Sequence, residues 1–206
     1  MLERFRGLMG RLLTPPARLL IKLGVGPDLI TWVGTVALVA VALVMVPLGL
    51  LWQAALVLGV ISFTDMLDGQ VARLSGRTSR WGAFLDSSLD RVADGAVFTG
   101  VIIWFALGGR PVWAGVAAAA LVLGQVTSYV KARAESQGWQ VTGGLAARAD
   151  RLVIAYLGLL LQGIGVPYAL AVAVTVLALA GVITVGQRLR QVRRQADAEE
   201  ASEVDQ

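Results

Sequence analysis

Six long apolar stretches run through this chain and limit its possible folds more than any other feature of the sequence. A helix that crosses a lipid bilayer needs about 20 mainly apolar residues. By that measure the sequence predicts six membrane-spanning helices, at residues 29–49, 51–72, 84–107, 112–134, 151–164 and 168–188. Because these spans use more than half of the 206 residues, we expect an all-α integral membrane protein without a separate soluble domain.

Basic residues mark one side of this predicted bundle. The links after the first, third and fifth spans contain a single basic residue, Arg110. The rest, except Arg91, lie in the other links, in the two terminal regions and at the span ends beside them. By the positive-inside rule, both termini and the even-numbered links face the cytoplasm, as in a multi-pass cell-membrane protein. The net charge of +4 therefore describes orientation in the bilayer and does not indicate a nucleic-acid partner.

Two terminal segments flank the six-span domain, which we place at residues 23–190. Within residues 1–22, apolar residues recur at helical spacing with arginines between them, which predicts an amphipathic helix lying in the membrane interface. A frayed basic leader is the alternative for this segment. Residues 191–206 are rich in charge and poor in large apolar side chains, which is typical of a solvated cytoplasmic tail.

The chain contains no His and no Cys, which excludes imidazole bases, thiol nucleophiles and the usual zinc ligands. Any metal that it binds must be held by oxygen atoms, which Mg²⁺, Mn²⁺ and Ca²⁺ prefer. An acidic side chain in the middle of a membrane costs about 2.5–3.5 kcal/mol, so positive charge must offset it. Five aspartates nevertheless lie in or at the ends of the second and third spans: Asp65, Asp68, Asp86, Asp90 and Asp94.

Four of these aspartates form two helical pairs. Asp65 and Asp68 are three residues apart and Asp86 and Asp90 are four apart, so each pair projects from one helical face. The Gly- and Ser-containing segment 74–81 predicts a tight cytoplasmic turn that makes the two spans antiparallel neighbours. We therefore expect the four carboxylates to face a common cavity and to hold two divalent cations. The alternative is pairing of these acids with neighbouring arginines.

The aspartates belong to a longer pattern. Residues 65–90 read D-x2-D-G-x2-A-R-x8-G-x3-D-x3-D, with the specified positions at Asp65, Asp68, Gly69, Ala72, Arg73, Gly82, Asp86 and Asp90. This run resembles the signature of the CDP-alcohol phosphotransferase family at every specified position. The resemblance implies six spans, with the signature across the second and third, and an active site on the cytoplasmic side.

The same resemblance implies a reaction and a set of roles. An acceptor hydroxyl attacks the β-phosphorus of a CDP-linked lipid, and CMP leaves. On this basis we expect Asp65, Asp68, Asp86 and Asp90 to hold two Mg²⁺ or Mn²⁺ ions, with Asp90 also acting as the catalytic general base. The residues expected to bind the CDP-lipid are Asp28, Thr31, Gly69, Ala72, Arg73 and Thr78. An N-cap of the first span is the structural alternative for Asp28.

Basic residues at the cytoplasmic ends of the last three spans predict an anion pocket for the phosphate of an acceptor alcohol. Its candidate members are Ser128, Lys131, Arg133, Arg148, Arg151 and Arg188. Each basic residue taken singly is equally typical of a positive-inside anchor whose side chain extends to the lipid headgroups.

Residues 128–135, together with residues 90–95, are similar to the actinobacterial phosphatidylinositol-phosphate synthases within this family. Those enzymes join CDP-diacylglycerol to 1D-myo-inositol 3-phosphate, so the resemblance implies this donor and this acceptor. Asp94 is then a candidate contact for the inositol hydroxyls, or else the partner of a neighbouring arginine. Phosphatidylglycerophosphate synthases commonly have Asp-Pro-x-Ala-Asp-Lys where this chain has Asp-Ser-Ser-Leu-Asp-Arg at residues 86–91, which argues against glycerol 3-phosphate as the acceptor.

Two other functions remain candidates. One is a phosphatidylglycerophosphate synthase or another member of the family with a different acceptor alcohol. The second is a small cation transporter that uses intramembrane acids, although the acids here lie toward one face of the bilayer. Family resemblance also implies a homodimer, and the small residues at 114–120 permit close contact between helices.

Overall fold

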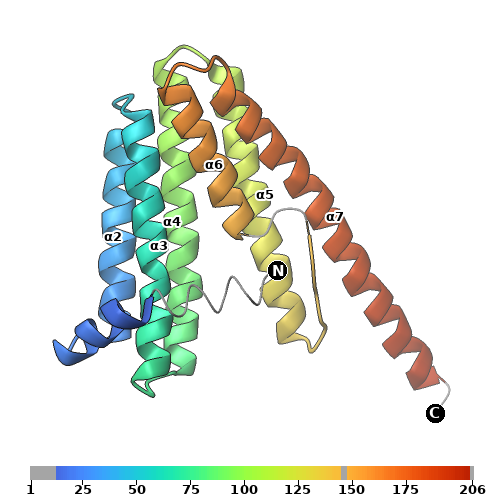
Figure 1. Cartoon of the computed structure of the whole chain (residues 1–206). Helices are drawn as coiled ribbons and strands as arrows, with labels where there is room; N and C mark the ends of the chain where they lie inside the picture. The colour runs from blue at the N-terminus through green and yellow to red at the C-terminus, as the bar shows by residue number, and fades with distance from the viewer. Residues whose placement is uncertain (1–12, 145–147, 205–206) are drawn as a thin grey trace. The chain divides into compact units, whose positions relative to one another are not determined.

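The computed structural model describes residues 13–144 and 148–204, and the chain forms two compact units, residues 1–100 and 101–206. Within the described residues, every regular element is a helix. The first unit contains a helical segment at residues 13–22, then α2 (Pro27–Met45), α3 (Leu51–Leu74) and most of α4 (Arg80–Leu107). The second unit contains the end of α4, then α5 (Pro111–Ser136), α6 (Arg148–Gly163) and α7 (Ala169–Val204). Figure 1 labels these helices and colours them from blue to red along the chain.

In the first unit, α2 packs along α3 (Figure 1). A glycine also allows α4 to approach α2, because a Cβ at Gly100 would overlap the backbone carbonyl of Ala42. The segment 13–22 buries Leu13 and Ala17, which share one face at a spacing of four residues. Residues 1–12 of the predicted interfacial helix lie outside the described residues, so the placement of that helix in the membrane interface stays a prediction.

In the second unit, α7 packs against both α5 and α6. Small residues allow the close approach. A Cβ added at Gly181 of α7 would lie 2.8 Å from the Cβ of Leu123, and one added at Gly158 of α6 would lie 2.6 Å from the Cβ of Ala173. Contacts of this kind are typical of helices that associate in lipid, where small residues let two backbones pack closely.

Four of the described helices are long and apolar enough to cross a membrane: α2, α3, α5 and the segment Ala169–Ala201 of α7. Large apolar side chains on them, such as Val36, Leu56, Val122 and Val176, point outward, as expected of a protein that lies in lipid. The other two predicted spans correspond to α4, which carries three aspartates, and α6, which has only 16 residues. The structure therefore supports a helical membrane protein, and the number of six spans stays a prediction.

The helix bounds follow the predicted spans closely, with one large difference at the C-terminus. The sequence predicts the end of the last span at residue 188 and a solvated tail at residues 191–206, and the solvation of this tail stays a prediction. α7 continues without interruption to Val204. The drop in hydropathy at Arg188 marks the end of the apolar segment and not the end of the helix, since charged residues such as Arg and Glu are good helix formers.

Candidate active site

Capping residues at the end of α3 and the start of α4 fix the turn between these two helices. Gly76, at φ +67°, takes the left-handed conformation that ends a helix. The N–H of Arg77 then donates to the carbonyl of Ala72 at 2.9 Å. Ser79 caps the next helix, since its hydroxyl oxygen accepts a hydrogen bond from the N–H of Gly82 at 2.9 Å. These two caps place residues 77–79 beside the ends of both helices.

A cavity of about 370 Å³ lies beside this turn in the first unit. All six residues predicted to bind the CDP-lipid lie in its wall. The complete lining consists of Pro27, Asp28, Thr31, Asp68, Gly69, Ala72, Arg73, Arg77, Thr78, Ser79, Gly82, Ala83 and Asp86. Gly69, Ala72, Gly82 and Ala83 carry little or no side chain, so a bound molecule can approach the backbone of both helices there.

The first turn of α2 contributes one edge of the cavity. Pro27 is the first residue of the helix, and Gly26 is its N-cap, so the alternative interpretation of Asp28 as an N-cap is wrong. Asp28 lies in the first turn instead and lines the cavity. The buried hydroxyl of Thr31 donates a hydrogen bond of 2.6 Å to the carboxylate of Asp68, which joins α2 to α3.

Three of the four predicted metal ligands meet in one cluster. Asp65 of α3 and Asp86 and Asp90 of α4 each offer a carboxylate oxygen, and these oxygens lie within 4.8 Å of one another. An all-carboxylate set fits a hard divalent cation and suits neither copper nor a structural zinc ion. The fourth, Asp68, accepts hydrogen bonds from Thr31 and from the N–H of Gly69. Its role as a metal ligand stays a prediction.

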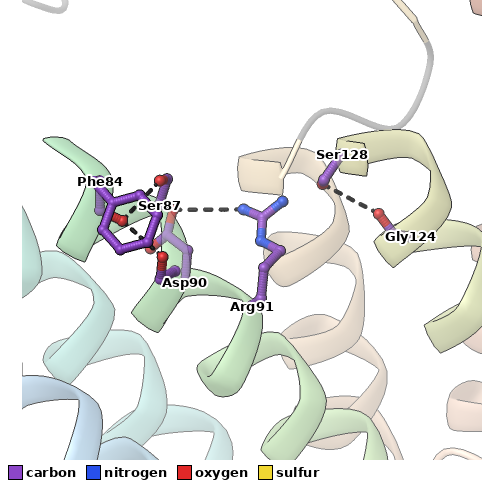
Figure 2. A network of polar contacts seen from close by, with 7 residues as sticks. Phe84, Ser87, Asp90, Arg91, Gly124 and Ser128 are labelled. Carbon is purple, nitrogen blue, oxygen red and sulfur yellow. Dashed lines mark hydrogen bonds and ion pairs between the residues drawn. The ribbon is translucent and has the colours of Figure 1, made fainter. Parts of the chain in front are cut away.

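Asp90 also has a basic neighbour. The guanidinium of Arg91 lies 3.6 Å from its carboxylate, and a dashed line in Figure 2 marks this ion pair. The alternative of pairing with an arginine therefore holds in part for Asp90, since this carboxylate belongs both to an ion pair and to the acidic cluster. Asp94, one turn further along α4, is only 4% exposed and is absent from the cavity wall described above. Its contact with inositol stays a prediction.

All eight specified positions of the signature lie either in the cavity wall or in the acidic cluster. Six of them line the cavity and three form the cluster, and Asp86 belongs to both. This arrangement places hard-cation ligands next to a site with backbone access and two arginines, Arg73 and Arg77. Such a combination suits a diphosphate group, which needs positive charge and hydrogen-bond donors.

The second unit buries two of the predicted acceptor-pocket arginines. Arg151 of α6 is 3% exposed and Arg188 of α7 is 8% exposed. Both side chains adjoin α5, because Arg151 lies against Gly124 and Arg188 reaches the backbone of Thr127. Arg188 donates to the backbone carbonyls of Thr127 at 2.6 Å and Gly143 at 3.2 Å. Buried charges are stable in a protein when they are paired and hydrogen-bonded, and a phosphate beside two guanidinium groups is a favourable partner of this kind.

Polar atoms beside these arginines lack partners within the described part of the chain. They are the Nε of Arg188 and the hydroxyl of Thr127, which is almost fully buried. Gly124, one turn before Ser128, leaves the space that Arg151 fills, since a Cβ there would lie 3.2 Å from its Nε. Ser128 itself donates a hydrogen bond to the carbonyl of Gly124 (Figure 2).

The remaining predicted pocket members lie differently. Lys131 is exposed and pairs with Glu135 at 3.6 Å, and the exposed Arg133 bonds the hydroxyl of Ser136 at 3.5 Å. Arg148 lies half-buried at the start of α6. The structure therefore brings together Arg151 and Arg188, and it gives Lys131 and Arg133 local partners on α5.

Sequence reasoning missed several residues of both sites. Arg77 and Ser79 line the cavity, and Gly124 and Thr127 adjoin the buried arginines. A signal existed for Gly124, because it lies four residues before Ser128 and seven before Lys131 and so shares their helical face. The role of Gly143 depends on the linker after α5, which no periodic pattern predicts.

Comparison with known proteins identifies the family. A sequence model of the CDP-alcohol phosphatidyltransferase family matches residues 25–186. The phosphatidylinositol phosphate synthase of Cutibacterium acnes is 44% identical over 207 aligned positions, which cover 96% of this chain and 100% of that protein. The phosphatidylinositol phosphate synthase of Streptomyces avermitilis is 45% identical, with 98% of this chain and 88% of the relative covered.

Solved structures give the same result. A crystal structure of the Mycobacterium tuberculosis phosphatidylinositol phosphate synthase with CDP-DAG bound is 43% identical and has a TM-score of 0.84, covering 88% of this chain and 94% of that chain. A second structure of the enzyme, in complex with manganese and citrate, gives the same identity and TM-score over 87% of this chain and 88% of the other. This chain therefore belongs to the CDP-alcohol phosphatidyltransferase family, whose members use divalent metal cations.

Proposed function

We propose that this membrane enzyme is a phosphatidylinositol-phosphate synthase. It transfers the phosphatidyl group of CDP-diacylglycerol to a hydroxyl of 1D-myo-inositol 3-phosphate, and it releases CMP. The observation that carries the proposal is the placement of all eight signature residues around one cavity and its acidic cluster. The 44% and 45% identity to proteins named phosphatidylinositol phosphate synthases supports the choice of acceptor.

In this reaction the cavity binds the donor. Arg73, Arg77, Asp28 and Thr31 line this cavity. In the proposed reaction the two arginines contact the diphosphate, and Asp28 and Thr31 contact the nucleoside. A second cavity of about 350 Å³ lies along the same helix, with a mostly apolar wall that includes Leu29, Val33 and Ile61. Its chemistry suits a fatty-acyl chain of the donor.

Asp90 is the proposed general base. It accepts the proton of the attacking hydroxyl as the new phosphorus–oxygen bond forms and the bond to CMP breaks. Arg91 keeps a compensating positive charge beside it. Divalent cations held by Asp65, Asp86 and Asp90 would supply the charge that neutralises the diphosphate and the leaving CMP.

The buried arginines of the second unit are the proposed acceptor site. Arg151 and Arg188 supply two positive charges, and the Nε of Arg188 and the hydroxyl of Thr127 supply polar atoms to a phosphate. Around this chemistry we propose six membrane spans, with both termini and the active site on the cytoplasmic side, and a homodimer.

The test is a measurement of CMP release by the purified protein. Protein, CDP-diacylglycerol and Mg²⁺ are incubated with inositol 3-phosphate, free inositol or glycerol 3-phosphate in separate reactions, and a chelator is added to a parallel set. We expect release with inositol 3-phosphate, loss of it with the chelator, and recovery with Mg²⁺ or Mn²⁺. Preference for glycerol 3-phosphate would assign the other acceptor, and no release with any acceptor would refute the proposed activity.

A further inference from the structure

The linker after α5 is bound along the C-terminal part of α7. We call its described residues 139–144 the linker strap. The N–H and carbonyl of Gln140 bond the side-chain amide of Gln195 at 2.9 and 2.8 Å. The N–H and carbonyl of Thr142 bond the amide of Gln191 at 3.2 and 3.0 Å. Each glutamine amide thus pairs with one backbone residue as a neighbouring β-strand would.

The two spacings match. Two residues of extended chain rise about 6.6 Å, and four residues of helix rise about 6 Å. Glutamines four apart on α7 therefore meet alternate residues of the linker strap. Between the two bonded residues, Val141 is only 4% exposed, so burial of its side chain adds to these hydrogen bonds in holding the linker strap.

The contacts follow an antiparallel order that ends at the proposed acceptor site. The Nε1 of Trp139 donates to Glu199 at 2.9 Å, and at the other end the guanidinium of Arg188 donates to the carbonyl of Gly143 at 3.2 Å. Gly144, at φ +118°, lies so close to Thr184 that a Cβ would come within 2.5 Å of its methyl group. A side chain at position 144 would therefore push the linker strap away from α7.

We propose that Gln191 and Gln195 are positioning residues for the acceptor phosphate. They hold the linker strap so that the carbonyl of Gly143 fixes the guanidinium of Arg188, which has only one other backbone acceptor, the carbonyl of Thr127, in the described residues. The inference rests on the proposed function, because it takes Arg188 as an acceptor ligand. It assigns a binding role to a part of α7 that lies beyond the apolar segment.

The experiment compares the Gln191→Ala/Gln195→Ala double variant with the wild-type full-length protein. Hydrogen exchange of residues 139–144, followed by mass spectrometry, reports on the linker strap itself. Titration calorimetry gives the Kd for inositol 3-phosphate, and steady-state kinetics give KM for each substrate. We expect faster exchange and an increase of about tenfold in Kd and KM for inositol 3-phosphate, which corresponds to about 1.4 kcal/mol, with KM for CDP-diacylglycerol unchanged.

Arg193→Ala is the matched control, since Arg193 lies on the same part of α7, is exposed and pairs only with Asp197 among the described residues. It should change none of these quantities. A second variant, Gln195→Glu, keeps an acceptor for the N–H of Gln140 and loses the donor to its carbonyl, so we expect a smaller effect in the same direction.

Three results would overturn the inference. They are unchanged exchange in the double variant, faster exchange with an unchanged Kd for inositol 3-phosphate, and a parallel rise in KM for both substrates, which would indicate general loosening. A wild-type protein that binds no inositol 3-phosphate would instead refute the proposed acceptor. The exchange data would still establish whether the glutamines hold the linker strap.

Discussion

The partner of each acidic side chain at this site depends on its position around the helix axis. Asp65 and Asp68 are three residues apart, which leaves them about 60° apart around the axis. Asp65 therefore faces the acids of α4, while Asp68 faces Thr31 of α2. The common face of the pair was readable from the spacing, but the choice between metal and threonine depends on which helix packs against each side.

A substitution at Asp90 tests its proposed role as the general base. Asp90→Asn keeps the size of the side chain and removes its ability to accept a proton, so we expect turnover to fall by about 10²–10⁴-fold while the melting temperature in detergent stays near the wild-type value. CMP release with inositol 3-phosphate measures the first quantity. Asp197→Asn, an exposed change on α7, should keep full turnover, and near-normal turnover of the Asp90 variant would contradict its role as base.

Arg77 provides a second prediction, on a residue that the signature does not include. Arg77 lines the cavity, whereas Arg80, also an exposed arginine, is not part of its wall. We expect Arg77→Ala to raise KM for CDP-diacylglycerol about tenfold, the equivalent of one lost charge-assisted contact of about 1.4 kcal/mol. Arg80→Ala should leave that KM unchanged. Equal effects of the two substitutions would mean that only the overall charge of the turn matters.

The members of the predicted acceptor pocket could be listed from the sequence, but their arrangement in space could not. Arg133 lies two residues after Lys131, about 200° around the helix, so local spacing already separates the two. Arg151 and Arg188 come from different helices that meet only through packing of α6 and α7. No spacing rule relates positions so far apart in the chain. Charge alone therefore predicted that Arg151 and Arg188 belong to an anion pocket, but it did not predict that they are buried together.

At the scale of helices, prediction worked where hydropathy and helix formation coincide. The spans at residues 51–72 and 112–134 correspond closely to α3 and α5. The ends differ because the lipid selects apolar residues whereas the helix requires only backbone hydrogen bonds, which charged residues tolerate. α7 is the clearest case, since its polar continuation holds the linker strap.

Two glycine substitutions in α7 test the helix packing of the second unit, and we expect them to change the stability in opposite directions. Gly181→Ala places a methyl group against Leu123 of α5, so we expect a loss of about 1–3 kcal/mol of stability from overpacking. Gly186→Ala on the same helix meets open space and should raise stability by about 0.5–1 kcal/mol through helix propensity. Thermal unfolding in one detergent measures both. Stabilisation by both substitutions would show that α7 does not need the close contact with α5.

At the scale of the whole molecule, the number of spans can be tested directly because the natural chain has no Cys. Single-cysteine variants are Arg110→Cys, Val166→Cys and Gln137→Cys. A membrane-impermeant maleimide should label the first two in intact cells and the third only after lysis, since six spans place residues 110 and 166 outside. An unlabelled Arg110→Cys would mean that α4 does not cross, and an unlabelled Val166→Cys would mean the same for α6.

The donor site is also confined to one stretch of the chain, with consequences for its biosynthesis. Every residue of the cavity and of the acidic cluster lies between positions 27 and 90, within the first compact unit. Arg188 is synthesised about 100 residues later, a delay of about 5–20 s at ordinary rates of translation. In the proposed mechanism, the residues that bind cations and CDP-lipid are therefore synthesised before Arg188 of the proposed acceptor site, so binding of these ligands would stabilise the first unit independently of that arginine.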